Sequence, residues 1–171
     1  MFPRYLLMVV LLCFSSVSYA ENVSLERFLA SNLGENPQIM TLWLKPPLKK
    51  RAETILEHPY QGLRVRYWQA NHRTAWILDE IGKEQPITTG VIVENGKIVS
   101  VEVLAYRESR GAEVQQSFFT RQFQGLSLTS NDKLNKKIDG ITGATLSVWA
   151  LQKISRLALM FDAEKESANK L

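Results

Sequence analysis

The chain has 171 residues, 45% of them hydrophobic, and a formal net charge of +4 at pH 7. This length suits one domain with its own core, and the scattered charges argue against nucleic-acid binding. The single cysteine, Cys13, lies in a segment that we expect to be removed, which excludes disulfides and cysteine chemistry from the mature protein.

Residues 1–20 have the pattern of a secretory signal peptide: Arg4, then an apolar run from Tyr5 to Phe14, then small residues up to Ala20. We expect cleavage after Ala20, a single domain over residues 21–171, and a periplasmic location, either free or associated with a membrane. The apolar run is about ten residues and a spanning helix needs about 20. Retention of this segment as an anchor is therefore the less favoured alternative.

Helical spacing of apolar residues predicts a helix from about Ser24 to Gly34. A second helix is predicted from Pro47 to about Glu57, with the basic triplet 49–51 opposite its apolar side. We interpret the triplet as a solvated helix face in preference to a site for an acidic partner or an anionic membrane.

Alternating apolar residues then predict two antiparallel pairs of strands. The expected strands are 63–68, 74–78, 86–93 and 97–105. Asn95-Gly96 suits a two-residue hairpin turn because both residues tolerate positive φ. In the last strand we expect Val99, Val101 and Val103 to face the core.

A polar turn leaves this last strand at residues 106–113, in a position that often carries binding sites. A short helix that carries Val114, Phe118, Phe119 and Phe123, a polar connection over 124–137, and a long amphipathic helix over 147–162 complete the chain. The residues after Asp162 are expected to fray. The predicted fold class is α+β, with an antiparallel sheet of about four strands, flanking helices and a long C-terminal helix.

Residues 139–147, Asp-Gly-Ile-Thr-Gly-Ala-Thr-Leu-Ser, form a small-residue turn that leads into the last helix. Gly143 and Ala144 leave the backbone open to close approach. The start of the helix offers free N–H groups and partial positive charge, which suit a phosphate. The hydroxyl of Thr145 is presented there. The alternative from the residues alone is that Thr142 and Thr145 only cap a turn and a helix.

These residues resemble the signature Asp-x-x-(Ser/Thr)-Gly-Ala-Thr of FMN-binding domains, found in the C subunit of the sodium-translocating NADH:quinone reductase and the G subunit of Rnf complexes. The hairpin 88–104 also resembles that family. Residues 107–111 fall where members often have Glu-Thr-Pro-Gly, and Arg110 replaces the proline here. The resemblance covers residues 81–161.

The resemblance implies that FMN is the cofactor and that its phosphate is joined to the hydroxyl of Thr145. The residues expected around this linkage are Asp139, Thr142, Gly143, Ala144, Leu146 and Ser147. The hydroxyls of Thr142 and Ser147 are expected near the phosphate. Asp139 either caps the turn or is read by the flavin transferase that attaches FMN.

For the isoalloxazine ring we expect Glu108 and Arg110 to contact its polar edge, with the alternative that they pair with each other or with solvent. Of the four tryptophans, Trp149 is the candidate for stacking on the ring because it lies one turn from Thr145. His58 and His72 lack neighbours at metal-ligand spacing, so we predict no metal site.

The function indicated is a periplasmic flavoprotein that relays electrons between a membrane-bound reductase or electron-transfer subunit and an acceptor. It would be an electron carrier more than a stand-alone enzyme. Two alternatives remain open: a flavin-free binding or adaptor module, and an oxidoreductase that holds FMN reversibly.

Overall fold

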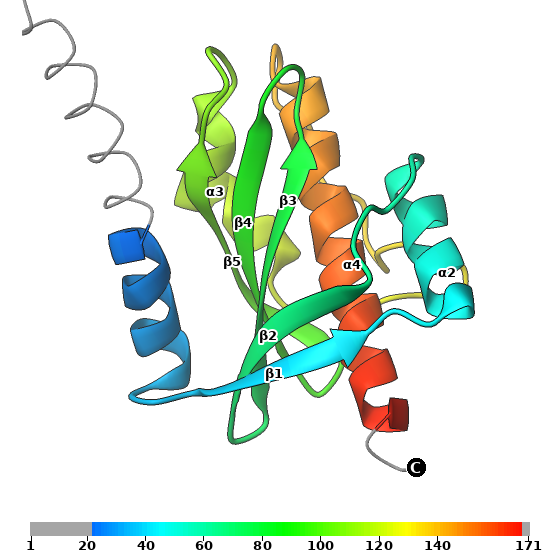
Figure 1. Cartoon of the computed structure of the whole chain (residues 1–171). Coiled ribbons are helices and arrows are strands. Elements are labelled where there is room, and N and C mark those ends of the chain that lie inside the picture. The colour runs from blue at the N-terminus through cyan, green and yellow to red at the C-terminus, as the bar shows by residue number, and fades with distance from the viewer. Residues whose placement is uncertain (1–21, 169–171) are drawn as a thin grey trace, which may run out of the picture.

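The computed structural model describes residues 22–168, so the expected signal peptide lies outside the described residues. A five-stranded sheet with strand order β1-β2-β3-β4-β5 forms the centre, and all neighbouring strands are antiparallel. A helix over residues 22–33 covers one face of the sheet, and the long helix α4 (Thr145–Ala168) covers the other (Figure 1). Within the described residues, no helix is both long enough and apolar enough to cross a membrane. The α+β prediction is confirmed.

The strands are β1 (Gln38–Trp43), β2 (Arg64–Ala70), β3 (Arg73–Ile81), β4 (Pro86–Glu94) and β5 (Lys97–Tyr106). The shorter helices are α2 (Pro46–Leu56) and α3 (Ser117–Thr120), with 3-10 turns η1 (Ala112–Gln115) and η2 (Arg121–Phe123). The four predicted strands and the predicted helices are all present. β1 was not predicted, because this edge strand buries only Leu42 and has little apolar alternation.

The β4–β5 hairpin turns at Asn95 and Gly96, whose φ angles of 51° and 70° match the prediction. The expected orientation of Val99 is wrong. The register passes from Ile92 opposite Ser100 to Val93 opposite Ile98, so Val99 is an extra residue in a bulge. Val101 and Val103 pack in the main core, whereas Val99 packs on the opposite face of the sheet.

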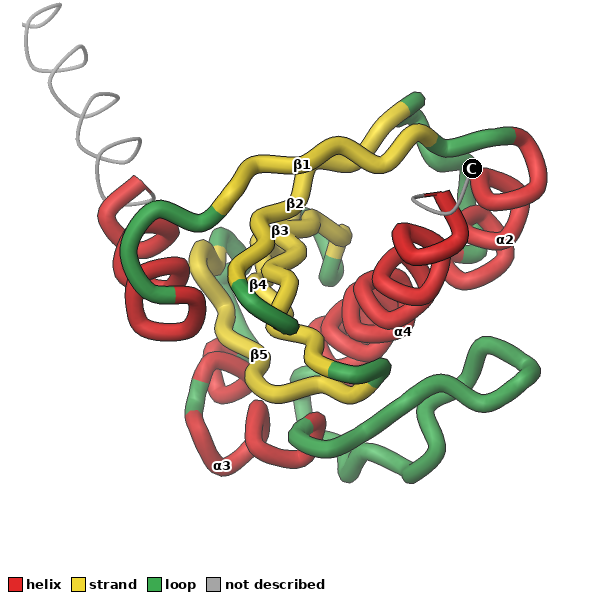
Figure 2. Tube along the Cα trace, turned by 90° about the horizontal axis from the view of Figure 1, so that it is seen from below, coloured by secondary structure: helices red, strands yellow, loops and turns green. Residues whose placement is uncertain are grey.

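The main core lies between the sheet and α4 (Figure 2). Trp76 is fully buried, with its ring stacked on Tyr67 at 4.5 Å between centroids and the Phe161 ring 5.7 Å away. α4 continues past the predicted end at Asp162, because the buried Asp162 carboxylate accepts a hydrogen bond of 2.5 Å from Thr74 and one of 2.6 Å from Lys165. These contacts fix the position of α4 on the sheet.

A cluster of charged side chains ties α2 and β3 to α4. Glu80 is buried to 6% exposure, its Oε2 atom lies 3.0 Å from His58 Nε2, and its Oε1 atom lies 3.7 Å from Lys153 Nζ. Lys153 also donates a 2.7 Å hydrogen bond to the Leu56 carbonyl at the end of α2. The hydrogen bond to Glu80 is the main cause of a raised His58 pKa.

This raised pKa predicts a pH dependence of stability. The ion pair contributes fully below the unfolded pKa of His58, 6.5, and its contribution is lost as the pH rises through the higher folded-state pKa. The excess Tm of the wild type over His58→Gln should therefore be largest near about pH 6 and shrink towards about pH 9. Calorimetry across this range measures it, and a difference that does not change with pH would contradict the prediction.

On the other face of the sheet, Phe28 of the first helix packs in a second buried cluster with Leu33, Ala75 and Ile92. Gly90 of β4 makes this packing possible. A Cβ atom at Gly90 would lie only 2.6 Å from Phe28 Cε1. The helix over residues 22–33 therefore depends on a position in β4 that carries no side chain.

The substitution Gly90→Ala should lower the free energy of unfolding by about 1–3 kcal/mol, because the added methyl overpacks the contact with Phe28. Urea denaturation measures the loss. In a Phe28→Ala background the same substitution should cost almost nothing further, since the clashing ring is absent. Equal losses in both backgrounds would show that the ring contact is not the cause.

Candidate functional site

A hollow of about 600 Å³ lies where α4 begins, at the top of the molecule in Figure 1. Three segments far apart in sequence line it: Lys83 of the β3–β4 turn, residues 108–110 after β5, and residues 143–147 at the start of α4. The structure thus brings Glu108 and Arg110 to the predicted signature. Asp139 and Thr142 are exposed nearby and are not among the lining residues.

Thr145 is the first residue of α4 and is exposed. The turn before it requires Gly143, whose φ is 83°. Ala144 is 4% exposed, and its carbonyl accepts the Val148 N–H at 3.0 Å, the first bond of the helix. Ala144 therefore occupies the N-cap position and has no hydroxyl. The Thr145 hydroxyl is not used as the N-cap, and it stands beside first-turn N–H groups that have no partner within the helix.

Glu108 holds the β3–β4 turn in place. Its Oε1 atom accepts hydrogen bonds from three consecutive backbone N–H groups, those of Lys83, Glu84 and Gln85, at 2.5, 2.7 and 3.0 Å. These bonds, that of Gln85 first, lower the pKa of the carboxyl group. A Cβ atom on Gly82 would lie 2.9 Å from the same oxygen. The sequence predicted Glu108 at the site but not its backbone partners, and a contact with the flavin stays a prediction.

Removal of this carboxylate should loosen the wall of the hollow that carries Lys83. In Glu108→Ala the amide protons of residues 83–85 should exchange with solvent at least about tenfold faster, because they lose their acceptor. Hydrogen exchange followed by NMR measures this. Glu102→Ala, at an exposed position of β5, is the matched control. Unchanged protection in Glu108→Ala would show that the carboxylate does not hold the turn.

Tyr106, the last residue of β5, joins the strand exit to α4. Its hydroxyl donates a 2.5 Å hydrogen bond to the Arg110 carbonyl and lies 3.1 Å from Ser147 Oγ. Gly111 has φ 85°, and a Cβ atom there would lie 3.0 Å from Ala144 Cβ. Burial raises the pKa of Tyr106. Ser147 lines the hollow, but it is 5% exposed and its hydroxyl is already bonded to Tyr106.

Asp139 is fixed through its backbone. Its N–H donates to Gln122 Oε1 at 2.8 Å, and Gln122 Nε2 donates to its carbonyl at 3.4 Å. The preceding residue, Ile138, is 5% exposed and packs in the main core, which also holds this segment in place. The Asp139 side chain is exposed, so it is accessible to a modifying enzyme. Recognition by a transferase stays a prediction, as does a contact between Thr142 and phosphate.

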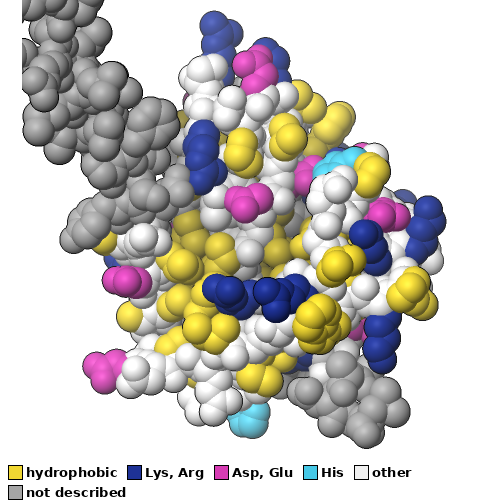
Figure 3. All heavy atoms as spheres, in the orientation of Figure 1, with side chains coloured by type: hydrophobic (Ala, Val, Ile, Leu, Met, Phe, Trp, Pro, Cys, Tyr) yellow, Lys and Arg dark blue, Asp and Glu magenta, His cyan; other side chains and the backbone are white. Residues whose placement is uncertain are grey.

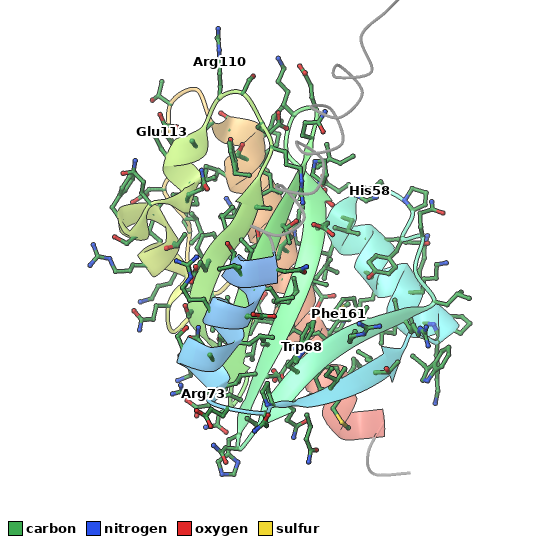
Figure 4. The ribbon with its side chains drawn as sticks, turned by 60° about the vertical axis from the view of Figure 1, so that its left-hand side comes forward. His58, Trp68, Arg73, Arg110, Glu113 and Phe161 are labelled. Atoms are coloured by element: carbon green, nitrogen blue, oxygen red, sulfur yellow. The ribbon has the colours of Figure 1, made fainter. Side chains whose placement is uncertain are left out.

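The rim of the hollow combines positive charge with exposed apolar surface. The Arg110 side chain extends outward from the loop in Figure 4, away from the body of the protein. Lys83 is exposed in the β3–β4 turn, and its backbone N–H is bonded to Glu108. Leu146 and Trp149 are 41% and 55% exposed on the first turns of α4. Trp149 is thus outside the core, but it is not among the residues that line the hollow, so its role in stacking stays a prediction.

Lys83, Tyr106, Gly111 and Gln122 were not found from the sequence. The partners of Tyr106 and Gln122 in the signature lie 41 and 17 residues away, so no local pattern marks them. The only available signal was position, since Tyr106 and Gly111 bound the polar turn after a buried strand.

The dimensions and chemistry of the hollow fit a flavin nucleotide. Its volume of about 600 Å³ lies in the range of small-molecule sites. The N-terminus of a 24-residue helix supplies N–H donors for a phosphate, and the exposed apolar side chains of Leu146 and Trp149 suit an aromatic ring.

In a comparison with family models, residues 82–160 match the FMN-binding domain. The matched range begins in the β3–β4 turn and ends within α4, so it includes all residues that line the hollow. It also agrees with the range 81–161 indicated by the sequence signature. No curated protein sequence matches the chain.

Proposed function

Because residues 82–160 belong to the FMN-binding domain family, with FMN as the cofactor, we propose that this protein carries FMN covalently on Thr145. We further propose that it acts in the periplasm, where it relays electrons between a membrane-bound reductase and an acceptor. The observation that carries the proposal is the exposed Thr145 hydroxyl, held at the first residue of α4 inside the hollow.

The local chemistry supports a phosphoester at this position. The N-terminus of α4 carries a partial positive charge of about half a unit, and its first N–H groups point towards the position of the phosphate. Lys83 and Arg110 add two cationic groups to the lining. A phosphodiester that joins FMN to Thr145 carries one negative charge. The cationic groups would pair with this charge, so it would not be buried without a partner.

Covalent attachment also suits the proposed location. A flavin held only by contacts would dissociate and be lost outside the cytoplasm, whereas a tethered one stays with the protein. When bound, FMN supplies the redox chemistry, and the chain holds it, orients it and sets its electrostatic environment. Leu146 lines the hollow and is exposed, as is Trp149 on the next turn of α4. A flavin held there would be open to partner proteins, which suits exchange of electrons better than enclosure of a small substrate.

The two alternatives from the sequence, a flavin-free adaptor module and reversible FMN binding, can both be distinguished from covalent attachment. The family match argues against a flavin-free adaptor module, and the N-cap position of Ala144 removes the capping role assumed for Thr145 there. Reversible FMN binding would use the same hollow. It differs in one property, since acid denaturation would release the yellow cofactor.

The test is the intact mass of the protein after coexpression with a flavin transferase. The wild type should gain the mass of one FMN less one water, Thr145→Ala should gain nothing, and Thr145→Ser should retain the adduct because it keeps the hydroxyl. Thr54→Ala, at an exposed position of α2 outside the signature, is the matched control and should keep the adduct. An unmodified wild type, or an adduct on Thr145→Ala, would overturn the proposal.

A further inference from the structure

The sheet divides between β2 and β3. Their pairing runs only from Ala70 opposite Arg73 to Tyr67 opposite Trp76. Beyond this point β3 continues to Ile81 along β4, while β2 remains paired with β1 back to Arg64. The β1–β2 ribbon therefore swings away from β3, as Figures 1 and 2 show. We call the opening between these two strand segments the strand split.

A hollow of about 540 Å³ occupies the strand split. Arg64, Arg66 and Trp68 line it from β2, and Ile77 and Asp79 line it from β3. Figure 3 shows hydrophobic side chains recessed on this face, with Lys or Arg side chains below them. The hollow is thus concave, partly apolar and bounded by the edges of two strands.

The charges in the strand split are not balanced. Arg64 and Arg66 are both exposed, and neither guanidinium forms an ion pair with a carboxylate among residues 22–165, the part of the chain whose side chains are described. Arg64 is instead held over the Trp43 ring, 5.6 Å from its centroid. The one carboxylate in the lining, Asp79, accepts a 2.5 Å hydrogen bond from Thr88. Two guanidinium groups therefore remain available to external carboxylates.

The edge of β3 supplies a second recognition element. Alternate residues of an antiparallel strand present their N–H and C=O groups to the same edge. From Ile77 to Ile81, β3 pairs with β4 on one side and faces the strand split on the other. An extended peptide can pair with such an edge while side-chain pockets select its sequence.

We propose that the strand split is the docking site for an extended acidic segment of a partner protein. The segment adds a strand along Ile77–Ile81, and its carboxylates pair with Arg64 and Arg66. Trp68 and Ile77 receive its intervening apolar side chains. A lipid headgroup would use the arginines but not the backbone edge, so the geometry favours a peptide over a membrane surface.

The strand split is connected to the flavin hollow through β3. β3 ends at Ile81 and leads directly into the turn that carries Lys83, which lines the flavin hollow. A segment bound along β3 therefore approaches the flavin hollow from the sheet side. The docking proposal does not rest on covalent flavin attachment, because none of its residues lies in the signature.

The experiment measures binding of a fluorescent eight-residue peptide with alternating Glu and Val to the purified protein by anisotropy. The wild type should bind it, and a peptide with Lys in place of Glu should bind at least about tenfold more weakly. N-methylation of every second peptide bond should also weaken binding at least about tenfold, because it removes the ladder hydrogen bonds.

The double variant Arg64→Glu with Arg66→Glu should lose at least about tenfold in affinity. The double variant Lys136→Glu with Lys137→Glu has the same change in net charge at exposed positions and should stay within about twofold of the wild type. Circular dichroism verifies the folding of both variants. Their flavin adduct, measured by intact mass, reports on the flavin site separately.

Four results would overturn the proposal, the last of them its strand-addition geometry. The first is no binding of the acidic peptide. The second is an equal loss of affinity in both double variants, which would indicate only a general charge effect. The third is binding of vesicles rich in phosphatidylserine that depends on Arg64 and Arg66 in the absence of peptide binding, which would assign the surface to a membrane. N-methylated peptide that binds as well as the parent would overturn the strand-addition geometry.

Discussion

The close approach between the loop after β5 and the first turn of α4 is the constraint on which the proposed flavin site depends. It requires Gly111, since any side chain there would collide with Ala144 and Tyr106. The Tyr106 hydroxyl then links the Arg110 carbonyl to Ser147, so the loop and the helix hold one position relative to each other. Thr145 lies in the chain between Ala144 and Ser147, which make these contacts, so its backbone is fixed as well. The proposed attachment site is thus exposed while the backbone on both sides of it is fixed.

This close approach would not fix the position of Thr145 if α4 could slide along the sheet. Its other end is fixed by Asp162, which is bonded to Thr74 of β3 and is almost fully buried. Between the two ends, Phe161 packs on Trp76, and Lys153 reaches the end of α2. A buried carboxylate with its hydrogen bonds satisfied specifies one register of the helix, whereas apolar packing alone tolerates several. The core therefore sets the place at which the N-terminus of α4 emerges.

The parts of this structure that the sequence predicted are those encoded locally. Asn95-Gly96 specified its hairpin, and the apolar stripe of α4 specified its buried face. The role of Thr145 in the signature stays a prediction. The failures have a common physical origin in contacts between distant segments. β1 is a strand because β2 pairs with it, and Val99 faces away from the main core because a bulge shifts the register.

Glu108 shows the same limit within the site. Its location in the polar turn after β5 was predictable, and it lines the hollow as expected. Its partners were not predictable, because the backbone N–H groups that it accepts lie 23 to 25 residues earlier in the chain. A carboxylate that receives three such bonds behaves as part of the scaffold. Sequence located the residue, and only the fold defined what it holds.

The two hollows share one structural element, and this affects how partner and cofactor would influence each other. β3 borders the strand split with Ile77 and Asp79, and its following turn is held by Glu108 at the flavin hollow. Asp79 is bonded to Thr88 of β4, and Thr88 also accepts a hydrogen bond from Arg107, the neighbour of Glu108. A strand added along β3 would contact the first member of this series. In the proposed complex, coupling between the two hollows would run through these contacts, from Asp79 to Thr88, Arg107 and the turn held by Glu108.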